Sequence, residues 1–486
     1  MCSSCRWWLA SLILGLFAGC SRSTTGGARA GLSARCDLDA GSCDPRPTAA
    51  VQLDLLNLRG VAVGKDGAAY VTGALIPPTR SFDGTALTSA GALDVFVGRY
   101  WPTGHAAWVR RVGDLGIQDP TGLAVTRGGT VAVAGHFTGR IQADSVSLTS
   151  PDSQGADFLL GFAASDGQLR WGHAFADGAE GALSSVAAST DQDRIAVCGH
   201  ATQAATGLVP EATFQGDRDA IVALFDGSGR RIWSRQLGGA GDEDCAAVAV
   251  DASGDVYAAG AYNRAFTLAT PLPETAGADN EWIWVAKLDG RTGAVVSQAA
   301  FGGPTAAQRP TSLAVDRDGA VVLGGMMNGA LEFGGQSRPL VSAGYVDGFV
   351  ARLDARATPP FQARWAVRLG GPSVDGTRSV AFDPFGDVIA AGFYSVRTTG
   401  AAALSGEPPG TDAFLLVLDG TTGATRSALR FGDRDTQTAD RVATGQGPDG
   451  RPYLVLGGEL TGTIELGSLP ALRGGPAGAT YLIFAR

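Results

Sequence analysis

The sequence predicts an all-β fold, a seven-bladed β-propeller built from four-stranded antiparallel blades. Three observations support this prediction: a motif that recurs seven times, four strand-like segments in each copy, and the composition. With 71 glycines among 486 residues, the chain is too rich in glycine for a helical fold. It is 45% hydrophobic and therefore not a disordered chain.

The copies align on an apolar residue that recurs every 62 to 67 residues. These residues are Val61, Leu123, Val186, Val248, Leu313, Val380 and Val442. A fixed period of this length indicates a repeat architecture rather than several unrelated domains.

The fourth copy shows the four strands most clearly. Its first three apolar segments are residues 248–251, 256–260 and 284–289, and a fourth follows the turn at 290–293 and ends at Phe301. Short turns with Asp and Gly separate the first pair and the last pair, whereas about twenty variable residues separate the middle pair. Uninterrupted apolar runs such as 195–198 and 321–323 are typical of strands that are buried on both faces.

A tryptophan marks the fourth strand in four copies, at Trp108, Trp171, Trp233 and Trp365. In these copies the distance from this strand to the next copy is constant, which indicates a structural unit. A series of β-sandwiches or a linear solenoid is the alternative, but both need caps at their ends. Here the last copy ends on its third strand, and residues 50–53 supply a fourth strand from the other end of the chain. We therefore expect the ring to close through these residues.

The repeat resembles a bacterial β-propeller repeat known as SBBP. The matching segments are residues 249–260, 314–325, 347–354 and 412–419. The resemblance covers the chain from about residue 49 to the end. It implies the propeller fold and a place among exported lipoproteins, without a settled activity.

The N-terminus predicts export and lipidation. Arg6 precedes an apolar run at residues 7–17, which suits a signal peptide better than a membrane span. Residues 17–20, Phe-Ala-Gly-Cys, resemble the bacterial lipobox, which makes Cys20 the acylated residue; an ordinary secretory signal is the alternative. We expect a lipoprotein signal peptide at residues 1–19, a flexible tether at 20–48 and the propeller at 49–486.

Four cysteines remain outside the signal peptide and the lipidation site: Cys36, Cys43, Cys198 and Cys245. An even number in an oxidising compartment predicts disulfides, with Cys36 able to bond Cys43 and Cys198 able to bond Cys245. A metal-binding knuckle at the first pair is the alternative, but that pair has no histidine nearby.

No catalytic or cofactor-binding motif occurs in the sequence. We find no nucleophile elbow, zinc-protease helix or phosphate loop, and we predict no metal and no cofactor. His136 and His200 occupy equivalent places in neighbouring copies, and we expect hydrogen-bonded rather than catalytic side chains. Turns such as 316–319 contain too few oxygen ligands for calcium, and their Asp and Gly suit tight hairpins.

The strand order separates two faces. One face carries the short turns; the other, the long-loop face, carries the second-to-third and fourth-to-first connections, where binding sites usually lie. Acidic residues gather there, interrupted by Arg309 and Arg378, and they form either a solvated rim or a site for a cation or basic partner. The candidate ligand-binding residues are Asp119, Glu180, Asp242, Glu243, Asp244, Asp375 and Asp440.

The functional prediction is a lipid-anchored propeller of the cell envelope, in the outer membrane, that binds or scaffolds a protein or glycan without catalysis. An extracytoplasmic enzyme, glycan-cleaving or quinoprotein-like, and a purely structural envelope component are the alternatives. The net charge of −9 argues against nucleic acid as a partner.

Overall fold

The structure is a computed structural model. It describes residues 45–151, 153–175, 182–189, 191–202, 207–209, 215–275, 280–303, 307–395, 398–400, 404 and 410–486. The predicted signal peptide, Cys20, Cys36 and Cys43 lie outside these residues. Within them, no helix is long and apolar enough to cross a membrane.

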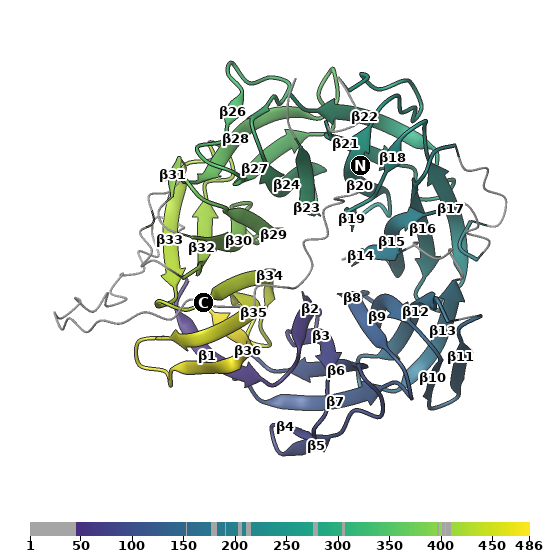
Figure 1. The fold of residues 1–486 in the computed structure, drawn as a ribbon, viewed down its shortest axis with the longest axis vertical. Coiled ribbons are helices and arrows are strands. Elements are labelled where there is room, and N and C mark those ends of the chain that lie inside the picture. Colours follow the sequence, from purple (N-terminus) through teal and green to yellow (C-terminus); the bar gives the residue numbers. More distant parts are fainter. Residues whose placement is uncertain are drawn as a thin grey trace, which may run out of the picture. The chain divides into compact units, whose positions relative to one another are not determined.

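The chain folds into seven antiparallel blades, as predicted (Figure 1). Blade 1 contains β2 (Asn57–Val63), β3 (Ala69–Leu75), β6 (Asp94–Tyr100) and β7 (Ala106–Val112). Blade 2 contains β8 (Gln118–Val125), β9 (Thr130–Phe137), β12 (Ala156–Ala163) and β13 (Leu169–Phe175). Blade 3 contains β14 (Ala182–Ala188), β15 (Arg194–Ala201), β16 (Asp219–Asp226) and β17 (Arg231–Leu237).

The remaining blades repeat this order. Blade 4 contains β18 (Asp242–Glu243), β19 (Ala247–Val250), β20 (Val256–Asn263), β21 (Trp282–Leu288) and β22 (Val295–Phe301). Blade 5 contains β23 (Gln308–Val315), β24 (Ala320–Met327), β27 (Asp347–Asp354) and β28 (Gln362–Gly370), with the short strand β31 (Thr399–Gly400) added at its edge. Blade 6 contains β29 (Gly376–Phe382), β30 (Val388–Tyr394), β32 (Asp412–Leu418) and β33 (Thr425–Phe431).

Blade 7 joins the two ends of the described chain. It contains β34 (Gln437–Gln446), β35 (Pro452–Ile464), β36 (Leu472–Ala485) and, as its outer strand, β1 (Pro47–Leu53). Ala50 pairs with Ile483 and Leu53 pairs with Thr480, which confirms the predicted ring closure. The strand begins earlier than predicted, because Pro47 already pairs with Ala485 and the backbones of Arg46 and Arg486 exchange hydrogen bonds.

The first strands of the blades lie innermost, and each packs against the first strand of the next blade (Figure 1). The contact from β34 to β2 completes the ring. Short hairpins extend three of the second-to-third connections: β4 (Arg80–Phe82) with β5 (Thr85–Leu87), β10 (Arg140–Ala143) with β11 (Val146–Thr149), and β25 (Ala330–Leu331) with β26 (Leu340–Val341).

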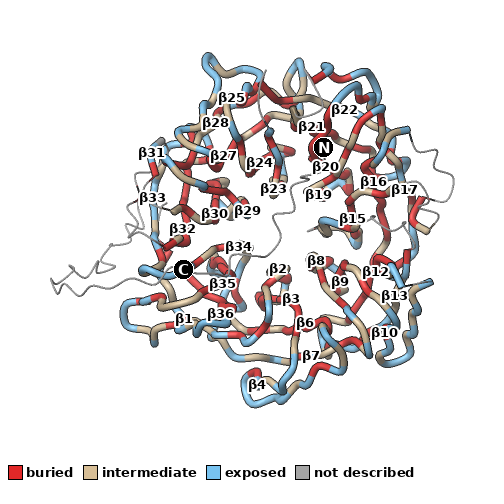
Figure 2. The backbone as a smooth tube through the Cα atoms, viewed as in Figure 1, coloured by how far each residue is buried: buried red, intermediate tan, exposed pale blue. Residues whose placement is uncertain are grey.

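The hydrophobic core is divided among the blade boundaries. One of its clusters joins Val222 of blade 3 to Val248 and Trp284 of blade 4, and similar clusters occupy the other boundaries. Buried residues follow the middle strands of every blade (Figure 2). The apolar runs 195–198 and 321–323 are fully buried, as their uninterrupted pattern predicted.

The short turns are built by their aspartates. The Asp251 carboxylate accepts hydrogen bonds from the backbone N–H groups of Ser253 and Asp255, each at 2.9 Å, while Gly254 adopts a φ of +88°. Asp316 and Asp383 bind their own turns in the same way. The turn residues thus have the structural role that the sequence predicts for them.

The fourth-strand tryptophans tie each blade to the next. The Trp233 indole N–H donates to the Gly290 carbonyl in the third-to-fourth turn of blade 4, at 3.3 Å. Its ring lies against Gly293, where a Cβ atom would stand 2.7 Å from the indole. Trp108, Trp171 and Trp365 make the equivalent hydrogen bond to the next blade. This explains the constant spacing that follows the tryptophan in the sequence.

Candidate functional site

The long-loop end of the innermost strands carries most of the predicted site residues. In six blades the pairing between first and second strands shifts by one residue at the same place, which is a β-bulge. Bulges re-aim a side chain and are common beside binding sites. The residues inside these bulges are Arg59, Thr121, Ser184, Thr311, Arg378 and Asp440.

The acidic residues here pair with arginines from neighbouring blades. Arg59 of blade 1 donates to Asp119 of blade 2 at 3.3 Å, and Arg309 of blade 5 binds Asp244 of blade 4 at 2.9 Å. The first pair joins β2 to β8, and the second joins β23 to the segment between β18 and β19. The predicted acidic rim is therefore largely neutralised at these positions, and the carboxylates help to hold adjacent blades together.

Asp440 of blade 7 lies in a denser group of charges. Its carboxylate is 4.0 Å from the Arg378 guanidinium of blade 6 and accepts a hydrogen bond from the Thr438 hydroxyl at 2.7 Å. Arg441 donates to the backbone carbonyls of Asp440 and Arg59, each at 2.8 Å, and so links blade 7 to blade 1.

Two other predicted site residues, Glu243 and Asp375, are buried, so they do not form part of a solvated rim. The Gly239 N–H donates to Glu243 at 2.7 Å, and the Gly371 N–H donates to Asp375 at the same distance. Asp375 also accepts from the Ser395 N–H at 2.9 Å. Both carboxyls thus tie down the connection that enters their own blade, because a buried backbone N–H needs an acceptor.

The same position carries glutamine in three other blades. Gln118 and Gln437 accept from the N–H group four residues earlier. Their side-chain amides donate to the Thr138 carbonyl in the second-to-third loop of blade 2 and to the Thr461 carbonyl near the end of β35 in blade 7. Gln308 donates to the corresponding loop of blade 5. We call Gln118, Glu243, Gln308, Asp375 and Gln437 the loop-tying residues. The sequence offered a signal for them, since each lies five residues before the aligned apolar residue of its copy.

Burial raises the pKa of both carboxyl members of this set. The pKa of Glu243 rises to about 8, chiefly through loss of hydration, with a further contribution from the nearby Asp219 and Asp242 carboxylates. Its side chain is inaccessible to solvent, so a substrate could not reach it. The pKa of Asp375 is also raised by burial.

The other predicted site residues have varied positions. Asp242 is half-buried on β18 opposite Asn263, and Glu180 lies outside the described residues. Cys198 and Cys245 form a disulfide with their Cα atoms 5.6 Å apart. It links β15 of blade 3 to the segment between β18 and β19 of blade 4, so it adds a covalent bond across one blade boundary.

Comparison with known proteins gives fold-level similarity. No family model matches the chain, and no curated protein sequence matches it. Among solved structures, the Dos1 propeller is 12% identical with a TM-score of 0.45, covering 90% of this chain and 95% of its own. Quinohemoprotein alcohol dehydrogenase from Comamonas testosteroni is 13% identical with a TM-score of 0.40, covering 90% and 76%. The resemblance to the SBBP repeat therefore stays a prediction from the sequence.

The histidines and carboxylates are dispersed around the ring. Among the residues that the structure describes, no three His, Cys, Asp or Glu side chains lie close enough to hold a metal ion. His136 contacts Asp157 at 3.2 Å and the Gln154 carbonyl at 3.2 Å, and the hydrogen bond to Asp157 raises its pKa. His173 contacts the Gly229 carbonyl at 2.7 Å.

The long-loop face also exposes apolar side chains, which sequence reasoning missed. Leu115 is 77% exposed and Ile117 is 40% exposed in the connection from blade 1 to blade 2. Tyr345 is 75% exposed and Val374 is 40% exposed around blades 5 and 6, where Val346 and Val374 form a β-bridge. We call these the blade 1–2 patch and the blade 5–6 patch.

Proposed function

We propose that this protein is a lipid-anchored propeller of the cell envelope that binds a protein or glycan partner through its long-loop face, without catalysing a reaction. The observation that carries the proposal is the pair of apolar patches on that face. Exposed apolar side chains on loops held by a rigid scaffold are typical of interaction surfaces.

The distribution of apolar exposure supports this face over the other. Most of the large apolar side chains exposed among the described residues lie in its connections, including Leu56 and Val341. On the short-turn side, the corresponding exposed side chains are Phe385 and Val296, which lies at the start of β22. The loop-tying residues also hold these connections in place through hydrogen bonds. The apolar patches are therefore already ordered before binding, which limits the conformational entropy lost when a partner binds.

The contacts of the predicted acidic residues Asp119, Glu243, Asp244, Asp375 and Asp440 support binding over catalysis at these residues. An enzyme that cleaves glycans needs a carboxyl group free to give or take a proton. Asp119, Asp244 and Asp440 instead pair with arginines, whereas Glu243 and Asp375 bind backbone N–H groups. These contacts therefore give the carboxylates a structural role.

The location outside the cytoplasm rests on the N-terminal sequence and on the Cys198–Cys245 disulfide. Structural disulfides persist in oxidising compartments. Acylation of Cys20 would add a stable membrane anchor, because several buried acyl chains bind far more strongly than one.

The patches are tested by a pull-down from envelope extract with the purified full chain. We expect Leu115→Ser with Ile117→Ser, or Tyr345→Ser with Val374→Ser, to reduce recovery of a specific partner by about tenfold. Phe385→Ser is the matched control, because it removes an equally exposed apolar side chain from the opposite face. Loss of the partner only in the Phe385 variant would place binding on the short-turn face.

The anchor is tested separately. We expect Cys20→Ala to move the protein from the membrane fraction to the soluble fraction while its melting temperature is unchanged. Cys20→Ala protein that still requires detergent for extraction would contradict lipidation at this residue.

A further inference from the structure

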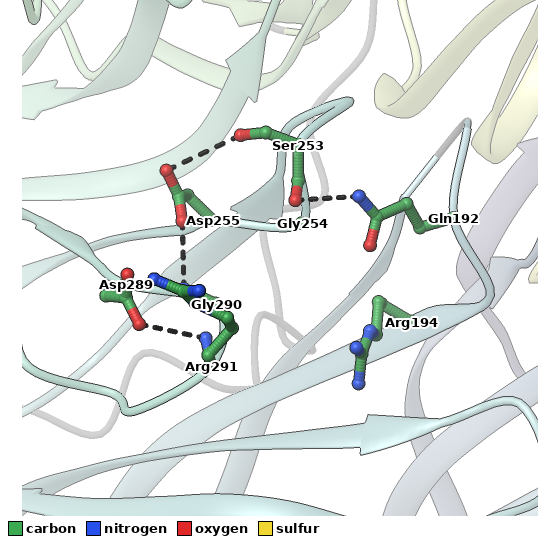
Figure 3. Close-up of a pocket in the computed structure, with 8 residues that line it drawn as sticks. All are labelled: Gln192, Arg194, Ser253, Gly254, Asp255, Asp289, Gly290 and Arg291. Carbon is green, nitrogen blue, oxygen red and sulfur yellow. Dashed lines mark hydrogen bonds between the residues drawn. The ribbon is translucent and has the colours of Figure 1, made fainter.

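A polar pocket lies on the short-turn face, opposite the proposed partner surface. It has a volume of about 350 Å³ and lies where three turns of blades 3 and 4 meet. Figure 3 shows Gln192 and Arg194 on one side of it, and Asp289 and Arg291 on the other. Ser253, Gly254, Asp255 and Gly290 complete its lining.

The carboxylates of this pocket are already engaged by the protein. Asp255 binds the Lys287 ammonium at 2.9 Å and accepts a hydrogen bond from the Gly290 N–H at 2.8 Å. Asp289 accepts hydrogen bonds from the Arg291 and Thr292 N–H groups and from the Thr292 hydroxyl, which lower its pKa. Both acids therefore hold turns together.

Neither the Arg194 nor the Arg291 guanidinium makes a hydrogen bond or ion pair with any residue that the structure describes, although the positive charge of Arg291 contributes to the lowered pKa of Asp289. Elsewhere on this face, basic side chains usually bind turn carboxylates: Arg99 binds Asp66, Arg352 binds Asp316, and Arg426 binds Asp387 and Asp419.

The boundary between blades 5 and 6 can be compared with this one. It has the same third-to-fourth turn and the same tryptophan hydrogen bond, but it lacks these two arginines. Asp419 accepts from Thr421 and Thr422 as Asp289 accepts from Arg291 and Thr292. The Trp365 indole donates to Gly420 as the Trp233 indole donates to Gly290.

At the boundary between blades 5 and 6, the residue equivalent to Arg291 is Thr421. Ala320 begins the second strand where Arg194 begins it, since Ala320 pairs with Asp354 as Arg194 pairs with Asp226. The turn and the tryptophan contact therefore form without either arginine. The two positive charges at the pocket are not required for this part of the fold.

We infer that this pocket binds a small carboxylate-bearing ligand, held by Arg194 and Arg291. A guanidinium donates two parallel hydrogen bonds to a planar carboxylate. Asp255 and Asp289 lie close by, so a carboxylate is favoured over a phosphate, whose second charge they would repel. Gln192 donates from its amide nitrogen to the Ser253 carbonyl at 2.7 Å, which leaves its amide oxygen to accept from a ligand hydroxyl. The ligand class is thus a hydroxy-carboxylate.

The test is calorimetric titration of the purified full chain with lactate, a hydroxy-carboxylate with a single negative charge, and, separately, with inorganic phosphate. We expect lactate to bind in the millimolar range or tighter, and Arg194→Ala with Arg291→Thr to weaken its binding at least about tenfold. These substitutions introduce the residues found at the equivalent positions between blades 5 and 6, so the variant should fold. Its melting temperature checks this expectation.

Arg317→Ala is the matched control, because Arg317 is an exposed arginine of a short turn outside the pocket. It should bind lactate like the wild type. Equal lactate affinity of the wild type and the double variant, or no heat of binding in the wild type, would overturn the proposal. Tighter binding of phosphate than of lactate would overturn the choice of carboxylate. Since the pocket and the apolar patches lie on opposite faces, either proposal can fail alone.

Discussion

Glu243 shows how one residue acquires a structural role from its place in the repeat. In blades 2, 5 and 7 the equivalent residue is a glutamine, which accepts from the incoming connection, donates at the second-to-third connection, or does both. Glu243 makes the first contact, but its other carboxylate oxygen is buried without a hydrogen-bond partner among the described residues. Burial at this position disfavours the charged carboxylate of Glu243 relative to its neutral form, which explains the raised pKa.

The raised pKa of Glu243 predicts a loss of stability as the pH increases. Between the ordinary pKa of 4.5 and about 8, the folded protein keeps a proton that the unfolded chain releases. The free energy of unfolding should therefore fall across this window and level off above it.

Glu243→Gln introduces the residue found at this position in blades 2, 5 and 7, and it should remove the loss of stability at high pH. We expect urea unfolding at about pH 9 to show the variant more stable than the wild type by a few kcal/mol, with a small difference at about pH 4. A difference in stability between the variant and the wild type that does not grow between these two pH values would contradict the assignment.

At the scale of the strands, adjacent blades are joined by three kinds of contact that repeat around the ring. Besides the tryptophan hydrogen bonds, serines of one first strand accept from the backbone of the next: the N–H groups of Val248, Val380 and Val442 donate to Ser185, Ser312 and Ser379. The arginine–carboxylate pairs form the third kind. They are partly exposed, so we expect each of them to contribute less than the buried contacts.

The disulfide strengthens the boundary between blades 3 and 4. It closes a loop with a sequence separation of 47 residues, which corresponds to about 4 kcal/mol of stability in the chain-entropy model. We expect dithiothreitol to lower the denaturant midpoint of the wild type, whereas a Cys198→Ala, Cys245→Ala variant should be insensitive to it. If the reductant leaves the wild-type midpoint unchanged, the bond contributes little.

The strands and turns could be predicted from the sequence because their determinants are local and occur seven times. The tryptophan spacing and the Asp-Gly turns are examples, and the ring closure followed from counting strands in the seventh copy. The fate of the acidic residues could not be predicted in the same way. Whether Asp119 faces solvent depends on Arg59, which is supplied by another blade 60 positions away in the sequence. Burial of Glu243 likewise depends on how its connection folds over it.

At the scale of the whole molecule, the propeller depends on a strand contributed by the far end of the chain. β1 is the outer strand of blade 7, and its side chains Ala49 and Leu53 belong to the cluster between blades 7 and 1. Without it, β36 would present an open edge and this cluster would lose part of its apolar contacts. Closure of this kind joins the two ends of the described chain in one sheet, so the loss of β1 would expose the edge of blade 7 next to blade 1.

The central claim is that residues 47–53 close the ring, and it is tested most directly by the melting temperatures of two truncated proteins. A chain that begins at residue 46 keeps β1 and the backbone hydrogen bonds between Arg46 and Arg486. A chain that begins at residue 57 lacks β1 entirely. We predict that the first melts as the corresponding region of the full chain does, whereas the second melts at a clearly lower temperature or fails to fold. Equal melting temperatures for the two proteins would contradict closure by the N-terminal strand.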